Sequence, residues 1–432
     1  MNAVFIAIVS IAFCVSTFRQ LVWSGPDDVS PMAELGQAVI EAASGSVTLA
    51  LGLVGVMALF LGLMKVAERG GLLIIIAKTL RPLLVRLFPD VPANHPAMGA
   101  MILNMAANVL GLGNAATPFG IRAMQQLDSL NPNKGTASDS MVLFLAINTS
   151  SITLVPTGVI ALRFAAGSED PAGIVPTTLF ATICSTAIAI FTAKLLAKRW
   201  PQVTNQSQTK SLSQPISADI EEPHKEWSDG ASGSYPVWVS ISVFIIVMTL
   251  VPMTVVYGRI IAPWIIPSLM IGLLWFGWCR GVCVYEAFIE GAKDGFDVAL
   301  RIIPYLIAIL VAVGMFRASG AMDLIINPLG TLTEIIGLPA EALPMALLRP
   351  LSGSGAYGIL ASIIQNPSIG PDSYVGYLVS TFQGSTETTF YVLAVYFGAV
   401  GIRRIRHALV AALCADIAGI AAAVFIVGKL YG

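Results

Sequence analysis

Two long apolar runs in this chain each contain a polar interruption near their middle. The first run extends from Met141 to Leu162 and is broken by Asn148–Thr153. The second extends from Tyr374 to Val400 and is broken by Gln383–Tyr391. Each run is long enough to cross a bilayer, which takes about 20 apolar residues. Polar groups at that depth must face protein or water. The pattern therefore predicts two unwound spans whose polar groups meet near the membrane midplane.

Other apolar runs predict membrane-spanning helices, and charged segments between them predict amphipathic helices. The charged segments are Glu34–Ser44, Leu72–Leu87 and Glu286–Asp297, and we expect Leu72–Leu87 to lie at a membrane interface. The predicted spans are Val4–Val22, Val47–Met64, Ile174–Ala193, Val237–Val256, Ile261–Trp278, Ile302–Phe316 and Ala408–Val427.

Glycine- and proline-rich stretches predict two re-entrant hairpins. Ala97–Gly113 is apolar but short, and it leads into the glycine-rich segment Gly111–Pro118. Ala342–Gln365 is broken in the same way by Arg349–Gly355. Irregular backbone at membrane depth is tolerated only where protein or a water-filled cavity covers it. A further segment, Leu324–Leu338, contains a proline, a glycine and a glutamate, so we expect it to be half-buried.

One long hydrophilic segment divides the chain. Residues 200–236 are rich in serine, glutamine and acidic residues, which is typical of a disordered linker. Lys194, Lys198 and Arg199 precede it, and the positive-inside rule therefore predicts that the linker is cytoplasmic. The predicted organisation is a first half of residues 1–199, the linker, and a second half of residues 237–432.

Composition supports a polytopic membrane protein. Hydrophobic residues make up 56% of the 432 residues, and charged residues only 11%, against about 25% charged residues in soluble domains. No cluster of basic and aromatic residues indicates a nucleic-acid partner. Cys279 and Cys283 have a spacing seen in metal sites, but no histidine or further cysteine lies nearby, so we expect no metal site.

The two halves can be aligned with each other in the same order. Ile40–Ala43 matches Ile289–Ala292, and Gly62–Met64 matches Val313–Met315. Further along, the glycine pairs, the Asp-Ser pairs and the polar interruptions match; these are Gly111–Gly113 with Gly353–Gly355, Asp139–Ser140 with Asp372–Ser373, and Thr149–Thr153 with Ser385–Thr389. Repeats in transporters are inverted or parallel. We expect an inverted repeat here.

The motifs of the first half resemble the spore maturation protein A family. They include His95–Met98, Asn104–Pro118 and Asn148–Ser151. The second half resembles the spore maturation protein B family through Glu290–Lys293, Arg301–Tyr305, Phe316–Gly320, Arg349–Ser354 and Gln383–Tyr391. Both families resemble the nucleoside-recognition, or Gate, domain family. That family includes the membrane gate of ferrous-iron transporters, and it is distantly similar to concentrative nucleoside transporters. The resemblance implies a helical membrane protein, and it makes a homodimer plausible.

The polar interruptions supply the candidate ligand-binding residues, because unwound backbone and short polar side chains hold substrates in broken-helix transporters. We expect the glycine hairpins to close the site from above and below. The candidates are Asn148, Thr149, Ser150 and Ser151 from one half, Gln383, Ser385, Thr386 and Glu387 from the other, and Asn114, Ser352 and Ser354 from the hairpins. The alternative for the hydroxyls is that they satisfy helix backbone or bond to a neighbouring helix.

Two acidic residues are candidates for coupling to an ion. As a carboxylate, Glu387 can bind Na⁺ or take up a proton, and an ionisable residue in a span is a functional hypothesis by default. The alternative is a structural ion pair with Arg349. Asp416 in the last span is the second candidate, and support of helix packing is the alternative there.

We therefore expect an all-α polytopic protein of the bacterial inner membrane, with broken helices and re-entrant hairpins. Its predicted function is secondary transport, coupled to H⁺ or Na⁺, of a small polar and nucleoside-like solute. The competing class is a non-transporting scaffold or regulator of an envelope complex. Enzyme motifs such as the P-loop, His-Glu-x-x-His and Gly-x-Ser-x-Gly are absent from the sequence, so we expect no enzyme and no cofactor.

Overall fold

The computed structural model describes residues 2–25, 29–111, 113–150, 152–200, 235–322, 324 and 333–432. Within these ranges every regular element is a helix, which confirms the predicted all-α fold. Four of the described helical segments are long and apolar enough to cross a membrane, namely Phe5–Val22, Pro31–Arg69, Pro171–Arg199 and Ala408–Tyr431. The chain is thus a multi-pass membrane protein. The predicted linker lies almost entirely outside the described residues, as does most of Leu324–Leu338.

Three helices are longer than the sequence pattern predicts. The predicted boundaries near Ser44, Val256 and Asp297 do not exist, because each charged or polar stretch continues the helix beside it. Each junction contains at most one glycine, and a single glycine costs a helix only about 1 kcal/mol. The continuous helices are α2 (Pro31–Arg69), α10 (Val237–Cys279) and α11 (Val284–Ala318).

Helices α2 and α11 pack against each other along their length and run in opposite directions. A methyl group added at Gly62, near the end of α2, would meet the ring of Phe288, near the start of α11, at 2.8 Å. At the other end of the pair, a methyl group at Gly314 would lie 3.1 Å from the Cβ of Ala42. Since α2 and α11 are matching elements of the repeat, their antiparallel arrangement agrees with the expected inverted repeat.

Each half also contains the short helices that the glycine motifs predict. In the first half, α4 (Pro96–Val109) turns into α5 (Gly113–Ser129), and the two helices pack together. In the second half, α13 (Leu343–Leu348) is followed by α14 (Gly353–Ile364). The side chain of Ser352 caps α14 by accepting a hydrogen bond from the Gly355 amide at 3.0 Å. The break predicted at Arg349–Gly355 is therefore confirmed.

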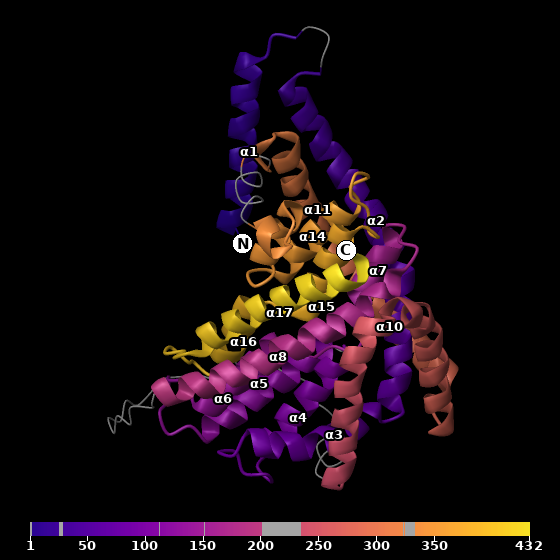
Figure 1. Ribbon diagram of the computed structural model, residues 1–432, viewed down its shortest axis with the longest axis vertical. Coiled ribbons are helices and arrows are strands. Elements are labelled where there is room, and N and C mark those ends of the chain that lie inside the picture. Colours follow the sequence, from indigo (N-terminus) through magenta and orange to yellow (C-terminus); the bar gives the residue numbers. More distant parts are fainter. Residues whose placement is uncertain are drawn as a thin grey trace.

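The two interrupted runs form broken helices at the centre of the molecule. The first run gives α6 (Asp139–Thr149) and α7 (Thr157–Ala165), and the second gives α15 (Tyr374–Ser385) and α16 (Thr389–Gly398). In Figure 1, α15 lies beside α17 (Ala408–Tyr431) and α8 (Ile174–Arg199), and these three helices contact one another. The remaining helices are α1 (Asn2–Val22), α3 (Leu72–Leu87) and the short turns η1 (Pro171–Gly173), η2 (Glu334–Ile336) and η3 (Ala340–Ala342).

Candidate functional site

The two unwound segments meet each other at the centre of the fold. One lies between Thr149 and Thr157, and the other lies between Ser385 and Thr389. The backbone amide of Glu387 donates a hydrogen bond of 2.8 Å to the carbonyl oxygen of Thr149. The prediction that both spans are unwound, and that their breaks lie together, is therefore confirmed.

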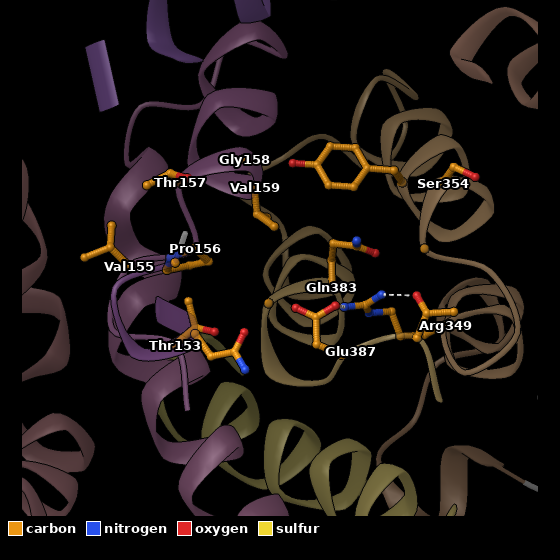
Figure 2. A pocket seen from close by; sticks show the side chains of 16 residues that line it. Thr153, Val155, Pro156, Thr157, Gly158, Val159, Arg349, Ser354, Gln383 and Glu387 are labelled. Carbon is orange, nitrogen blue, oxygen red and sulfur yellow. Dashed lines mark hydrogen bonds and ion pairs between the residues drawn. The ribbon is translucent and has the colours of Figure 1, made fainter. Parts of the chain in front are cut away.

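A cavity of about 340 Å³ lies beside this contact. Its walls come from the ends of α4, α7, α14 and α15 and from the segment before α16, so both halves contribute to it (Figure 2). A ligand pocket in a protein typically measures about 300–1,000 Å³. The lining residues are Asn108, Gly111, Thr153, Val155, Pro156, Thr157, Gly158, Val159, Arg349, Gly353, Ser354, Tyr357, Gln383, Gly384, Glu387 and Thr388.

Arg349 supplies a buried positive charge to the cavity wall and is only 5% exposed. Its guanidinium donates hydrogen bonds to the carbonyl oxygen of Thr386 and, at 3.1 Å, to the hydroxyl of Thr388. Both partners belong to the unwound segment. Arg349 therefore holds that segment in place while it presents charge to the cavity.

Glu387 lies 3.9 Å from Arg349, measured from carboxylate oxygen to guanidinium nitrogen, and half of its side chain is exposed. It extends into the cavity beside Gln383 (Figure 2). The ion pair with Arg349 is thus present, but its distance is close to the longest that counts as an ion pair. The exposed part of the carboxylate remains accessible to a ligand. Gln383 is only 7% exposed, and its side-chain oxygen has no hydrogen-bond partner in the described structure. An unpaired buried acceptor costs about 1–3 kcal/mol, so it is suited to a ligand donor.

The candidates Asn148, Thr149 and Ser150 are buried beside the cavity but do not line it. The hydroxyls of Thr149 and Ser150 each donate to the carbonyl of Ala146 at 2.9 Å. Asn148 accepts a hydrogen bond of 2.9 Å from the amide of Asn108, which does line the cavity. These hydrogen bonds stabilise the end of α6 and join it to the end of α4. Ser151 lies outside the described residues.

The candidates from the second half divide into two groups. Gln383, Glu387 and Ser354 line the cavity. Ser385 and Thr386 are buried outside its lining, and the hydroxyl of Ser385 donates to the carbonyl of Phe382 at 3.3 Å. Ser352 also lies outside the lining and acts as the cap of α14. Asn114 lies in the first turn of α5, and its side chain is outside the described structure.

Asp416 lies on α17, behind the start of α16, and it does not line the cavity. It is 2% exposed. One carboxylate oxygen accepts a hydrogen bond of 2.7 Å from Thr389, the first residue of α16, and the other has no partner in the described structure. No described Lys or Arg lies within ion-pair distance of it. Asp416 is therefore a buried acid directly behind the unwound segment.

Tyr357 and Gly158 are cavity residues that the sequence analysis did not identify. A methyl group added at Gly158 would lie 2.3 Å from the hydroxyl oxygen of Tyr357, so a residue from each half meets at this wall. Nothing in the local pattern identifies Tyr357, since it lies within an ordinary apolar helix. Arg349 was detectable, because it is a charge at the break of an apolar run, but its predicted role was only that of an ion-pair partner.

The electrostatics of the cavity combine both signs of charge. Helices α7 and α14 begin at its wall, and helix N-termini offer free amides and partial positive charge. Arg349 adds to this positive side, and Glu387 supplies the negative side. Within the described residues, no group of three or more metal-ligating side chains is present. The site can hold a small molecule that carries both hydrogen-bond donors and acceptors.

Parts of the chain are similar to known proteins. The chain is 48% identical over 167 residues to spore maturation protein B of Bacillus subtilis, which is 39% of this chain and 93% of that protein. It is 49% identical over 154 residues to spore maturation protein A of the same organism, which is 36% of this chain and 79% of that protein. The solved structure of CNTnw in an inward-facing substrate-bound state is 14% identical, with a TM-score of 0.47 over 99% of this chain and 93% of that one.

A family model described as nucleoside recognition matches residues 50–165 and 299–403, one segment on each side of residues 200–236. Together these segments cover just over half of the chain, and each includes one of the two broken helices. The chain therefore belongs to the nucleoside-recognition, or Gate, family, and it combines relatives of spore maturation proteins A and B in one polypeptide.

Proposed function

We propose that this protein is a secondary transporter of a small polar solute in the cytoplasmic membrane of a bacterium. The observation that carries the proposal is the meeting of two unwound helices, one from each half, at a cavity that contains Arg349, Gln383 and Glu387. A membrane scaffold does not need charged groups around a cavity at the centre of its fold, since buried charge is costly.

The solute that best fits the cavity is nucleoside-like. The family to which the protein belongs is described as nucleoside recognition, and the cavity volume lies within the usual range for small-molecule ligands. The oxygen of Gln383 offers an acceptor, while Arg349 and the start of α14 offer donors. A nucleoside carries hydroxyl donors and ring acceptors that can pair with both kinds of group.

Glu387 is the proposed coupling residue, because its carboxylate reaches the cavity and is held only at 3.9 Å by Arg349. A proton or Na⁺ on this carboxylate would free Arg349 for the solute, which links the two binding events. Asp416 is the second proposed acid. It accepts a hydrogen bond from Thr389, the first residue of α16, so a change in the charge of Asp416 would alter this bond at the end of the unwound segment.

We also propose that the chain is organised as two halves, residues 1–199 and 237–432, joined by a cytoplasmic linker. The antiparallel packing of α2 and α11 supports this division, as does one family match in each half. The basic residues Lys198 and Arg199 support the cytoplasmic assignment.

The test is a ligand-stabilisation screen of the purified protein with nucleosides, dicarboxylates, H⁺ and Na⁺, followed by uptake into proteoliposomes. We expect a nucleoside to raise the melting temperature and to accumulate when an ion gradient is imposed. Glu387→Gln should retain the fold and lose the dependence on that gradient. If no solute stabilises the protein or enters the vesicles, the scaffold function is favoured. Unchanged uptake by Glu387→Gln would remove Glu387 from the mechanism.

A further inference from the structure

Two buried arginines pair with aspartates across the boundary between the halves. Arg163 on α7 lies 2.8 Å from Asp372, and Arg406, before α17, lies 2.6 Å from Asp139. The two aspartates are matching residues of the internal repeat. Each pair thus joins an aspartate of one half to an arginine of the other half, and only the aspartates occupy matching positions of the repeat.

The pairs lie at opposite ends of the broken helices. Asp139 begins the first broken helix and Arg163 lies near its end. Asp372 precedes the second broken helix by two residues, and Arg406 follows it. Because each pair joins the start of one broken helix to the end of the other, the two helices run antiparallel. The contact between their breaks, where the cavity lies, is between the two pairs along each broken helix.

In both pairs the arginine side chain is buried and the aspartate is partly exposed. The arginine side chains are 0% and 7% exposed, whereas the carboxylates of Asp372 and Asp139 are 34% and 44% exposed. Each arginine also donates a hydrogen bond to a backbone carbonyl of the other half, close to its partner aspartate. Arg163 donates to the carbonyl of Pro371 at 2.6 Å, and Arg406 donates to the carbonyl of Ala137 at 3.1 Å. Water can reach each carboxylate, so each pair can be opened from its own side.

We propose that these two ion pairs are the alternating gates of the transport cycle. This inference rests on the proposed function. We name them the Asp372 gate and the Asp139 gate, and both are closed in this structure. A rigid movement of one half against the other separates the broken helices at one end only, so it breaks one pair and keeps the other. Opening a pair leaves its arginine without the partner carboxylate, which is unfavourable, so opening both pairs together is disfavoured.

The sidedness of the gates follows from the basic residues. Arg406 also donates to the carbonyl of Trp200, which directly follows Lys198 and Arg199. The positive-inside rule places that segment in the cytoplasm. The Asp139 gate therefore faces the cytoplasm, and the Asp372 gate faces the opposite side of the membrane.

The test measures access to the cavity and does not require a known solute. The five native cysteines are replaced, Ser354→Cys is introduced into the cavity wall, and membrane-impermeant maleimide is applied to right-side-out and inside-out vesicles. We expect Asp372→Asn to raise labelling from the outside by about tenfold and to lower it from the cytoplasm. Asp139→Asn should produce the reverse pattern.

Two controls separate gating from general loosening. Asp372→Glu keeps the charge and should label as the parent does. Asp128→Asn removes the 2.8 Å pair with Lys134, which lies within one half, and should leave labelling unchanged from both faces. The proposal is overturned if the two gate variants change labelling on the same face, on both faces equally, or on neither. A loss of transport with the expected labelling pattern would instead count against the solute or the coupling ion alone.

Discussion

The backbone amide of Glu387 donates a 2.8 Å hydrogen bond to the carbonyl of Thr149, so the two unwound segments are joined directly beside the cavity. This bond satisfies a carbonyl that the end of α6 leaves without an intrahelical partner. Because only backbone atoms take part, side-chain variants at either residue leave the bond available. The joining of the halves and the polar groups offered to a solute can thus be changed separately.

Gly158→Ala should narrow the cavity, because its methyl group would lie 2.3 Å from the hydroxyl oxygen of Tyr357. The next ring atom lies 3.4 Å away, which is ordinary contact. We therefore expect Gly158→Ala to weaken solute binding by about tenfold, which corresponds to about 1.4 kcal/mol. The double variant with Tyr357→Phe should recover most of that loss. Isothermal titration of the purified variants with the solute found in the screen measures both effects.

Gly120→Ala is the matched contrast away from the cavity. Its methyl group would lie 2.1 Å from the hydroxyl oxygen of Tyr396, but also 2.3 Å and 2.8 Å from ring carbons. Removing the hydroxyl with Tyr396→Phe should therefore fail to rescue Gly120→Ala. Equal rescue at both positions would show that the clash at Gly158 does not act through the hydroxyl.

Arg349→Ala should destabilise the protein, because the buried carbonyl of Thr386 loses its charged donor. A buried acceptor left without a partner costs about 1–3 kcal/mol. Arg349→Lys should recover only part of this, since one ammonium cannot reproduce the planar contacts to both Thr386 and Thr388. Equilibrium unfolding in mixed detergent gives the difference. A fully stable Arg349→Ala protein would contradict the supporting role given to this residue.

Gly295→Ala should disturb the contact between α2 and α11. The added methyl group would lie 2.6 Å from the Cα of Ala58, and backbone cannot move aside as a side chain can. Overpacking of this kind costs about 1–3 kcal/mol. Gly55→Ala on α2 is the control, because nothing lies within 4 Å of its added methyl group. The control should leave stability unchanged or raise it by about 0.5–1 kcal/mol. Equal effects of the two variants on unfolding would argue against close backbone packing.

His407 should make stability depend on pH. Burial lowers its pKa from the ordinary value of 6.5, and the charge of Arg406 lowers it further, while Asp139 and the backbone of Ala193 act in the opposite direction. The unfolded chain therefore binds this proton at a higher pH than the folded protein does. Stability should consequently fall as the pH decreases from about 7.5 to about 5.5. His407→Gln should reduce that fall in thermal unfolding curves, and an unchanged pH profile would exclude His407 as its source.

The broken helices were predictable because polar residues inside an apolar run have few physical explanations. Asn148–Thr153 and Gln383–Tyr391 each mark a real break. The helix lengths were less predictable, since a bilayer-length criterion divides α2, α10 and α11 where the backbone continues. Charged residues at one end of such a helix only require that this part leaves the lipid.

The site was predictable in part, for a related reason. Gln383, Glu387 and Ser354 line the cavity, while the hydroxyls of Thr149, Ser150 and Ser385 donate to carbonyls of their own helices. A hydroxyl in the last turn of a helix has that local alternative, and sequence does not show which partner it takes. The contact of Tyr357 with Gly158 depends on how the halves pack, so no local pattern contains it.

The reciprocal pairing of Arg163 with Asp372 and of Arg406 with Asp139 means that each half, taken alone, would lack the carboxylate that pairs with its arginine. Both ion pairs therefore form only when the two halves assemble. Synthesis as one polypeptide guarantees equal numbers of the two halves, and the tether keeps each at high effective concentration for the other. The one-to-one ratio of the two halves is thus fixed by their joining in one chain.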